Sequence, residues 1–150
     1  MRSFLLFLTT SFICTLVSAQ SAEDSVKTAI NTMFTAMRTA DEKLFWSVMS
    51  DSVILQGISK NKEGRTVILS EDVKSFARFI GLSKKDSLDE RISFDVVKTD
   101  GPLAIAWTPY TFYYNGKFSH CGVNSFQLVR MNGLWKIQYI IDTRRKDNCK

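Results

Sequence analysis

The chain has 150 residues, of which 45% are hydrophobic and 12% aromatic, so it can bury a core, and a disordered chain is excluded. The formal net charge is +5, and the basic residues fall in predicted turns and near the C-terminal end. Nucleic-acid binders gather such residues along one face of an element, so this pattern indicates a solvated surface and argues against nucleic-acid binding.

Residues 1–19 have the pattern of a secretory signal peptide. Arg2 precedes an apolar run, and small residues end the segment at Ala19. The run is short for a membrane span, and no second one follows in the sequence. We therefore expect export to the periplasm or secretion, one domain over residues 20–150, and no membrane association after cleavage.

Three helices are predicted in this domain. Apolar residues recur at steps of three and four over residues 20–40, and Ser21 with Asp24 resembles a capping box. Asp41 begins a second, short helix. A third helix begins after Asp72 and ends at Gly81.

Strands occupy the remainder. β-branched runs predict two short strands over residues 52–58 and 66–69, and alternation predicts a third over 89–98. Residues 103–145 contain two Asn-Gly dipeptides, the strongest short-range hairpin signal, and so predict three long antiparallel strands. Helices gathered on one face of such a sheet predict an α+β domain, a cone-shaped curved antiparallel sheet with its helices packed in the concave face.

The two turns also predict which side chains share a face, because two-residue turns set the pairing and strands alternate faces. The face expected to contact the helices carries aromatic walls and polar groups typical of a small-molecule pocket. No carboxylate is expected on it, and Asp142 is placed on the opposite face. The predicted ligand-binding residues are Trp107, Thr111, Tyr113, His120, Asn124, Phe126 and Tyr139.

His120 is the chain's one histidine and the candidate catalytic residue, since imidazole can act as acid or base near neutral pH. A structural hydrogen bond is the alternative. Pairing His120 with Asp142 would require a β-bulge, because strict alternation separates them. Asp41 is the other candidate base, although we expect it to act as an N-cap.

Two cysteines, Cys121 and Cys149, remain after removal of the signal peptide. In an oxidising compartment such a pair predicts a disulfide; a half-buried thiol and a frayed end are the alternative. One histidine and no Cys-x-x-Cys spacing give no metal-site pattern, and we expect no metal and no cofactor.

Two stretches carry a family resemblance. FQLVRMNGLWKIQYIIDT resembles the C-terminal hairpin of the nuclear transport factor 2-like (NTF2-like) superfamily, and WTPYTFYYNGKFSHCGVNSF resembles its secreted bacterial members, some classed as SnoaL-like or lumazine-binding. The resemblance covers residues 23–145 and implies the cystatin-like cone. The superfamily includes isomerases, dehydratases, cyclases, ligand carriers and interaction modules, so it does not select one function. Its isomerases use an inward carboxylate base, which the predicted covered face lacks.

Three hypotheses follow. The first is an exported domain that binds a small apolar or aromatic molecule, with Trp107, Phe126 and Tyr139 stacking on it. The second is an isomerase, dehydratase or hydrolase that uses His120 as acid or base. The third is an interaction module whose outer sheet face, where Tyr110, Phe112 and Tyr114 are expected, binds a second copy in a homodimer or another exported protein.

Overall fold

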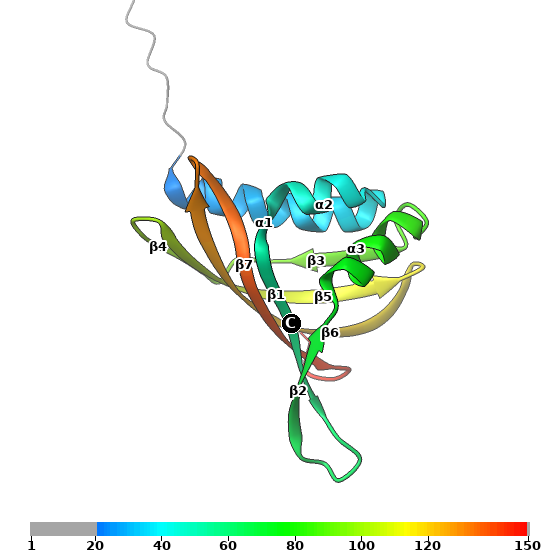
Figure 1. Ribbon diagram of the computed structural model, residues 1–150. Helices are drawn as coiled ribbons and strands as arrows, with labels where there is room; N and C mark the ends of the chain where they lie inside the picture. Colours follow the sequence, from blue (N-terminus) through cyan, green and yellow to red (C-terminus); the bar gives the residue numbers. More distant parts are fainter. Residues whose placement is uncertain (1–20, 150) are drawn as a thin grey trace, which may run out of the picture.

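The computed structural model describes residues 21–149, and the predicted signal peptide of residues 1–19 lies outside them. Within this range three helices lie in the hollow of a curved sheet (Figure 1). None of these helices is long and apolar enough to cross a membrane. The helices are α1 (Ala22–Thr39), α2 (Glu42–Val48) and α3 (Val73–Leu82).

The described residues form one seven-stranded sheet with the order β2-β1-β7-β6-β5-β3, and β4 also pairs with β5. The pairings are antiparallel except that of β1 with β7, which is parallel. The α+β prediction is confirmed, while the sheet is mixed rather than wholly antiparallel. The strands are β1 (Met49–Lys60), β2 (Thr66–Glu71), β3 (Leu88–Ile92), β4 (Val96–Asp100), β5 (Leu103–Tyr114), β6 (Lys117–Met131) and β7 (Leu134–Arg145).

Each helix begins at the polar residue that the sequence indicated. The Ser21 hydroxyl accepts a hydrogen bond from the backbone N–H of Asp24 at 3.0 Å. Asp41 caps α2 and Asp72 caps α3 in the same way. These caps satisfy N–H groups that a helix leaves unpaired at its start. Asp41 therefore has the structural role that was expected of it.

The core lies between α1 and the sheet. Val26, Ile30 and Phe34 lie on one side of α1, and Phe34 meets Phe126 of β6 edge to face, with ring centroids 6.1 Å apart. Trp135 and Ile137 of β7 are buried in the same cluster. The edge-to-face contact of Phe34 and Phe126 adds to the stability gained from burial alone.

A β-bulge interrupts the first hairpin. Tyr113 pairs with Phe118 next to the turn, but Phe112 pairs with His120, so Ser119 is an extra residue in β6. From Phe112 back to Leu103 the register is therefore shifted by one residue relative to the prediction. Because a one-residue shift reverses the faces of a strand, β5 presents its other side to the helices.

A second bulge interrupts the last hairpin. Leu128 pairs with Ile137, but Gln127 pairs with Tyr139, so Gln138 is the extra residue. The Ser50 hydroxyl donates to Gln138 Oε1 at 2.7 Å, and Gln138 Nε2 donates to the Ser52 carbonyl oxygen at 2.9 Å. These bonds tie the bulge to β1. The extra residue reverses the faces of β7 beyond residue 138.

The predicted strand over residues 89–98 is two strands. β3 and β4 both pair with β5, and residues 93–95 separate them. Backbone N–H groups of Ser93 and Asp95 donate to the carbonyl oxygens of Pro109 and Trp107, each at 3.0 Å. The chain thus bends while it stays attached to β5.

Cys121 and Cys149 form a disulfide, which confirms the predicted pairing, with Cα atoms 5.7 Å apart. The bond fastens the residues after β7 to β6. At one edge of the sheet, β2 and the last part of β1 form a hairpin that projects away from the helices (Figure 1).

Candidate functional site

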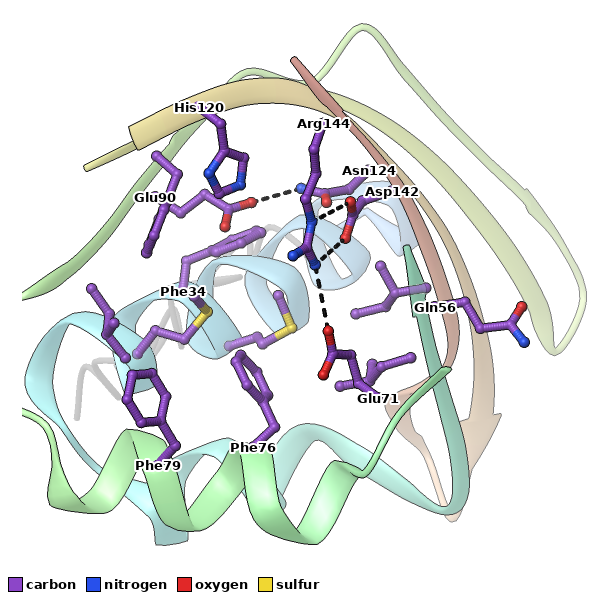
Figure 2. A pocket seen from close by; sticks show the side chains of 16 residues that line it. Phe34, Gln56, Glu71, Phe76, Phe79, Glu90, His120, Asn124, Asp142 and Arg144 are labelled. Carbon is purple, nitrogen blue, oxygen red and sulfur yellow. Dashed lines mark hydrogen bonds and ion pairs between the residues drawn. The ribbon is translucent and has the colours of Figure 1, made fainter. Parts of the chain in front are cut away.

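A cavity of about 230 Å³ lies between the helices and the concave face of the sheet (Figure 2). One wall comes from helices and the other from strands. It is lined by Met33, Phe34, Met37, Leu55, Gln56, Glu71, Phe76, Phe79, Leu88, Glu90, Phe112, His120, Asn124, Ile140, Asp142 and Arg144.

The helical wall is apolar. α1 contributes Met33, Phe34 and Met37, and α3 contributes Phe76 and Phe79. In Figure 2 the rings of Phe76 and Phe79 point from α3 into the cavity. Methionine and phenylalanine give a surface that accepts an apolar or aromatic body without competing for hydrogen bonds.

The sheet wall carries the charged and polar groups of the cavity, among the apolar side chains of Leu55, Leu88, Phe112 and Ile140. Glu90 of β3, His120 and Asn124 of β6, and Asp142 and Arg144 of β7 all point into the same space (Figure 2). Convergent polar groups opposite an apolar wall are the usual composition of a small-molecule site.

Asn124 connects two strands that are not neighbours. Its side-chain amide donates to Glu90 Oε1 at 2.8 Å and so joins β6 to β3 across β5. Glu90 faces the cavity and is only partly exposed, and the desolvation of its carboxyl raises its pKa to about 7. The negative charge of Asp142 also raises this pKa, whereas the hydrogen bond from Asn124 lowers it. Glu90 can therefore exchange a proton near neutral pH.

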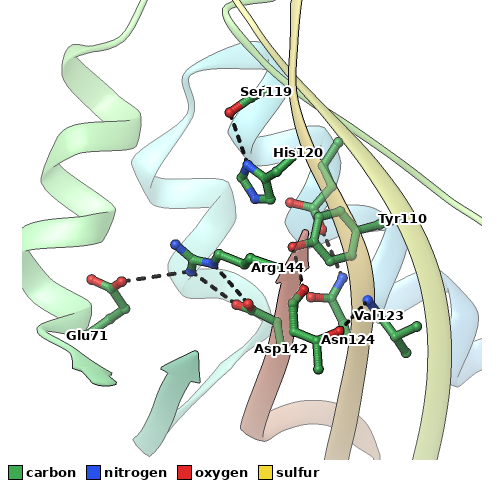
Figure 3. Close-up of polar contacts among 10 residues, drawn as sticks. Glu71, Tyr110, Ser119, His120, Val123, Asn124, Asp142 and Arg144 are labelled. Carbon is green, nitrogen blue, oxygen red and sulfur yellow. Dashed lines mark hydrogen bonds and ion pairs between the residues drawn. The ribbon is translucent and has the colours of Figure 1, made fainter. Parts of the chain in front are cut away.

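Asp142 and Arg144 form an ion pair on β7. Arg144 Nε lies 2.9 Å from Asp142 Oδ1, and an Nη atom lies 3.1 Å from Oδ2 (Figure 3). The same guanidinium lies 3.8 Å from Glu71 at the end of β2. It passes over Gly57, where an added β-carbon would come within 3.4 Å of it. The pair is bidentate, which fixes the orientation of the Asp142 carboxylate.

His120 lies beside this ion pair. Its Nδ1 is hydrogen-bonded to the Ser119 hydroxyl at 3.0 Å, and its ring packs edge to face on Tyr110 (Figure 3). Burial lowers the pKa of His120, and the positive charge of Arg144 lowers it further. The imidazole is therefore mainly neutral at neutral pH.

Tyr110 of β5 connects to β7, one of the strands that carry the polar residues of the cavity. Its hydroxyl donates to the Thr143 carbonyl oxygen at 3.0 Å, so the ring spans β6 to reach β7. Burial raises the pKa of Tyr110, which keeps the phenol neutral. The Thr143 hydroxyl accepts the backbone N–H of Val123 at 3.2 Å. These bonds hold β6 and β7 together where His120 and Arg144 project.

Comparison with protein-family models and with curated proteins finds no match to the sequence. Solved structures do match the fold. An NTF2-like protein of unknown function from Shewanella baltica aligns with a TM-score of 0.61 and 10% identity, over 82% of this chain and 93% of that one. A protein of unknown function with a cystatin-like fold from Nostoc punctiforme gives 0.65 and 12%, over 85% and 95%.

A third similar structure comes from Streptomyces avermitilis and is described as "a putative dehydratase from the NTF2-like family". It aligns with a TM-score of 0.60 and 14% identity, over 82% of this chain and 95% of that one. The chain has an NTF2-like fold. The resemblance seen in its last two hairpins is thus confirmed at the level of the fold.

Four of the predicted ligand-binding residues lie outside the NTF2-like cone. The bulge at Ser119 turns Trp107, Thr111 and Tyr113 to the outer face, and the bulge at Gln138 turns Tyr139 outward. Trp107 is 47% exposed there. The prediction that these four line the pocket was wrong. It assumed that the pairing set by each two-residue turn continues unchanged along the strands, whereas a bulge interrupts each hairpin.

The other predicted residues lie inside. His120 and Asn124 line the cavity, whereas Phe126 is fully buried in the core beneath α1. Tyr110 and Phe112 face inward, so the expected outer patch with Tyr114 is not formed. Asp41 is absent from the cavity lining.

Two carboxylates occupy a face on which none was expected. Asp142 is inward because the Gln138 bulge restores it to the side of His120, and Glu90 is inward because it pairs with Phe112. Sequence reasoning also missed Arg144, which was assigned to a solvated tail, and Glu71. One signal was available: in FYYNGKFSHCG a glycine at residue 122, inside a strand, is unusual and marks a close contact or a bulge.

Proposed function

We propose that the protein binds a small molecule with an apolar or aromatic body in the cavity between α1, α3 and the sheet. The observation that supports this most is the pairing of an apolar helical wall with a strip of convergent polar side chains. Drug-sized ligands fill cavities of roughly 300–1,000 Å³, and this cavity is about 230 Å³. The ligand is therefore smaller than such molecules.

Binding is tested at the mouth of the cavity. Phe79 lines the cavity yet is 46% exposed, so Phe79→Ala should weaken binding while the protein remains folded. Leu82→Ala, on the same helix and 81% exposed, is the matched control. Native mass spectrometry of protein purified from its host would identify a retained molecule. A molecule retained equally by both variants would place binding elsewhere.

We further propose that the protein is exported, as the signal-peptide pattern of residues 1–19 indicates. The Cys121–Cys149 disulfide supports this, because such bonds persist in oxidising compartments. Fractionation of host cells, followed by N-terminal sequencing of the purified protein, would test it. A protein that stays in the cytosol and begins at Met1 would contradict the proposal.

A second candidate function is acid–base catalysis, as in an isomerase, dehydratase or hydrolase. Glu90 supports it, since a carboxyl with a pKa of about 7 inside a cavity is suited to proton transfer at neutral pH. His120, with Asp142 and Arg144 beside it, is the second candidate acid or base. Deuterium incorporation next to the carbonyl of small ketones in D₂O, measured by NMR, would detect the chemistry. Glu90→Gln should abolish it, and exchange that survives this substitution would exclude Glu90.

A homodimer through the outer sheet face is the third candidate. Trp107, Ile105 and Ile54 are each nearly half exposed there. Interfaces are enriched in aromatic residues and depleted in charge at their centres. Across β5, β6, β7 and β1, two cross-strand rows are uncharged: Ile105, Gln127, Tyr139 and Ile54, and Trp107, Ser125, Ile141 and Gln56. On β4, Lys98 pairs with Ile105 at the edge of the first row.

Analytical ultracentrifugation tests the dimer. Trp107→Lys would place a charge in the second of these rows, so it should convert a dimer to a monomer without lowering the melting temperature. Lys98→Ala, at the edge of the same face, is the control. A wild-type protein that sediments as a monomer at high concentration would exclude the dimer.

A further inference from the structure

The charged side chains that line the cavity are out of balance. Three carboxylates, from Glu71, Glu90 and Asp142, face it, against one guanidinium, from Arg144. This is the reverse of the chain as a whole, which has a formal charge of +5. The excess of negative groups in a basic protein is therefore a local property of the cavity.

Arg144 does not correct the imbalance. Its guanidinium makes both of its short contacts with Asp142, at 2.9 and 3.1 Å, and its other contact, with Glu71, is longer at 3.8 Å. A bidentate pair satisfies both partners, so Asp142 is neutralised. The positive charge of Arg144 lowers the pKa of Glu90, but the two side chains form no ion pair.

Glu90 is left without a cation. Within residues 21–149 its one hydrogen-bond partner is Asn124, which reaches Oε1, and no lysine or arginine forms an ion pair with it. Glu90 is only partly exposed, and its side chain faces the cavity. A carboxylate that is partly buried without an ion-pair partner is costly, so it would attract a cation placed in the cavity.

The groups that face Glu90 from the surrounding elements favour a cation. α1 and α3 present apolar and aromatic side chains, and β5 presents Phe112 beside a neutral phenol, Tyr110. Aromatic faces attract cations. β6 presents Asn124 and His120, which is mainly neutral, and β7 presents the Asp142–Arg144 pair.

We infer that the ligand of this cavity is a small amine, whose positively charged nitrogen lies against Glu90 and whose apolar or aromatic body lies against α1 and α3. The inference rests on the proposed binding function and names the chemical class of the ligand. Glu90 is its counter-ion. A neutral ligand that accepts a hydrogen bond from protonated Glu90 is the competing possibility, and it has the opposite dependence on pH.

Three probes of one shape separate these possibilities: 2-phenylethylamine, 2-phenylethanol and 3-phenylpropanoate. Their dissociation constants would be measured at pH 6 and pH 8 by ¹H–¹⁵N NMR titration of the full mature chain, following residues of the cavity. The amine should bind about tenfold more tightly at pH 8 than at pH 6, because Glu90, with a pKa of about 7, is mostly protonated at the lower pH. At pH 8 it should also bind at least about tenfold more tightly than the alcohol.

Substitutions connect the effect to Glu90. Glu90→Gln keeps the shape of the side chain and removes its charge, so it should abolish both the preference for the amine and its pH dependence. Asp51→Asn, which removes an exposed carboxylate on β1, should leave both unchanged. Equal binding of amine and alcohol, a preference for the propanoate, or an amine preference that survives Glu90→Gln would overturn the inference.

The same titration separates this inference from the binding function. If the alcohol shifts cavity resonances as strongly as the amine, the cavity binds small molecules and the amine assignment fails alone. If none of the three probes shifts them, and native mass spectrometry finds no retained molecule, both the inference and the binding function fail.

Discussion

The ring of Tyr110 lies over Gly122, in space that any side chain at residue 122 would need. An added β-carbon would come within 2.8 Å of Tyr110 Cε1 and 1.7 Å of the Thr143 carbonyl oxygen. Glycine therefore permits the bond from the Tyr110 hydroxyl to Thr143, which braces the strands that carry His120 and Arg144.

Gly122→Ala is consequently expected to be strongly destabilising. The clash is with backbone, which cannot turn aside, so the free energy of unfolding should fall by about 3 kcal/mol. Gly57→Ala is the control, because its β-carbon would meet the Arg144 side chain at an ordinary contact distance of 3.4 Å. Urea unfolding of both variants measures the difference. Equal stabilities would mean that β6 and β7 can separate without cost.

Glu90 should make the protein less stable as the pH rises. The folded protein holds the Glu90 proton to about pH 7, whereas an ordinary glutamate releases it near 4.5. Between these values the unfolded chain binds fewer protons, so the free energy of unfolding falls with rising pH, by about 3 kcal/mol in total. Glu90→Gln should remove this part of the dependence, as measured by urea unfolding at pH 5 and pH 8. An unchanged slope in the variant would contradict the assignment.

Two neighbours of Glu90 should move its pKa in opposite directions. Asn124→Leu removes the amide that stabilises the carboxylate, so the pKa should rise, whereas Asp142→Asn removes a negative neighbour, so it should fall. ¹³C NMR of the labelled carboxyl measures both, with the signal assigned by its loss in Glu90→Gln. Shifts of the same sign would show that the cavity rearranges instead.

The disulfide should contribute about 3–4 kcal/mol to stability, the chain-entropy value for a bond that closes this length of chain. Its cysteines are 28 residues apart. Cys149→Ser should therefore lower the free energy of unfolding by that amount. Adding a reductant to the wild type should bring it to the level of the variant and leave the variant itself unaffected. A variant as stable as the oxidised wild type would show that the disulfide does not contribute to the free energy of unfolding.

Much of this fold could be predicted from local signals. Ser21, Asp41 and Asp72 each begin a helix because their side chains accept backbone N–H groups nearby in the sequence. The two Asn-Gly turns form where expected, since asparagine and glycine tolerate the positive φ that both adopt here. These features depend on interactions within a few residues.

The cavity lining depended on longer-range contacts. On β5, both alternating sets are apolar, so alternation could not show that Ala104 and Ala106 are buried while Ile105 and Trp107 are exposed. The pairing with β6 decides this, and Ser119 shifts it by one residue.

By itself the sequence determined the helices, the hairpins, the α+β class and the two cysteines that could pair. Only the tertiary structure decided which carboxylates meet in the cavity. The physical reason is that a single extra residue reverses every side chain beyond it, and the Gln138 bulge is held by Ser50 and Ser52, more than 80 residues away along the chain. Asp142 lies beside His120 because hydrogen bonds to β1 hold the Gln138 bulge in place, and β1 belongs to neither of the two hairpins.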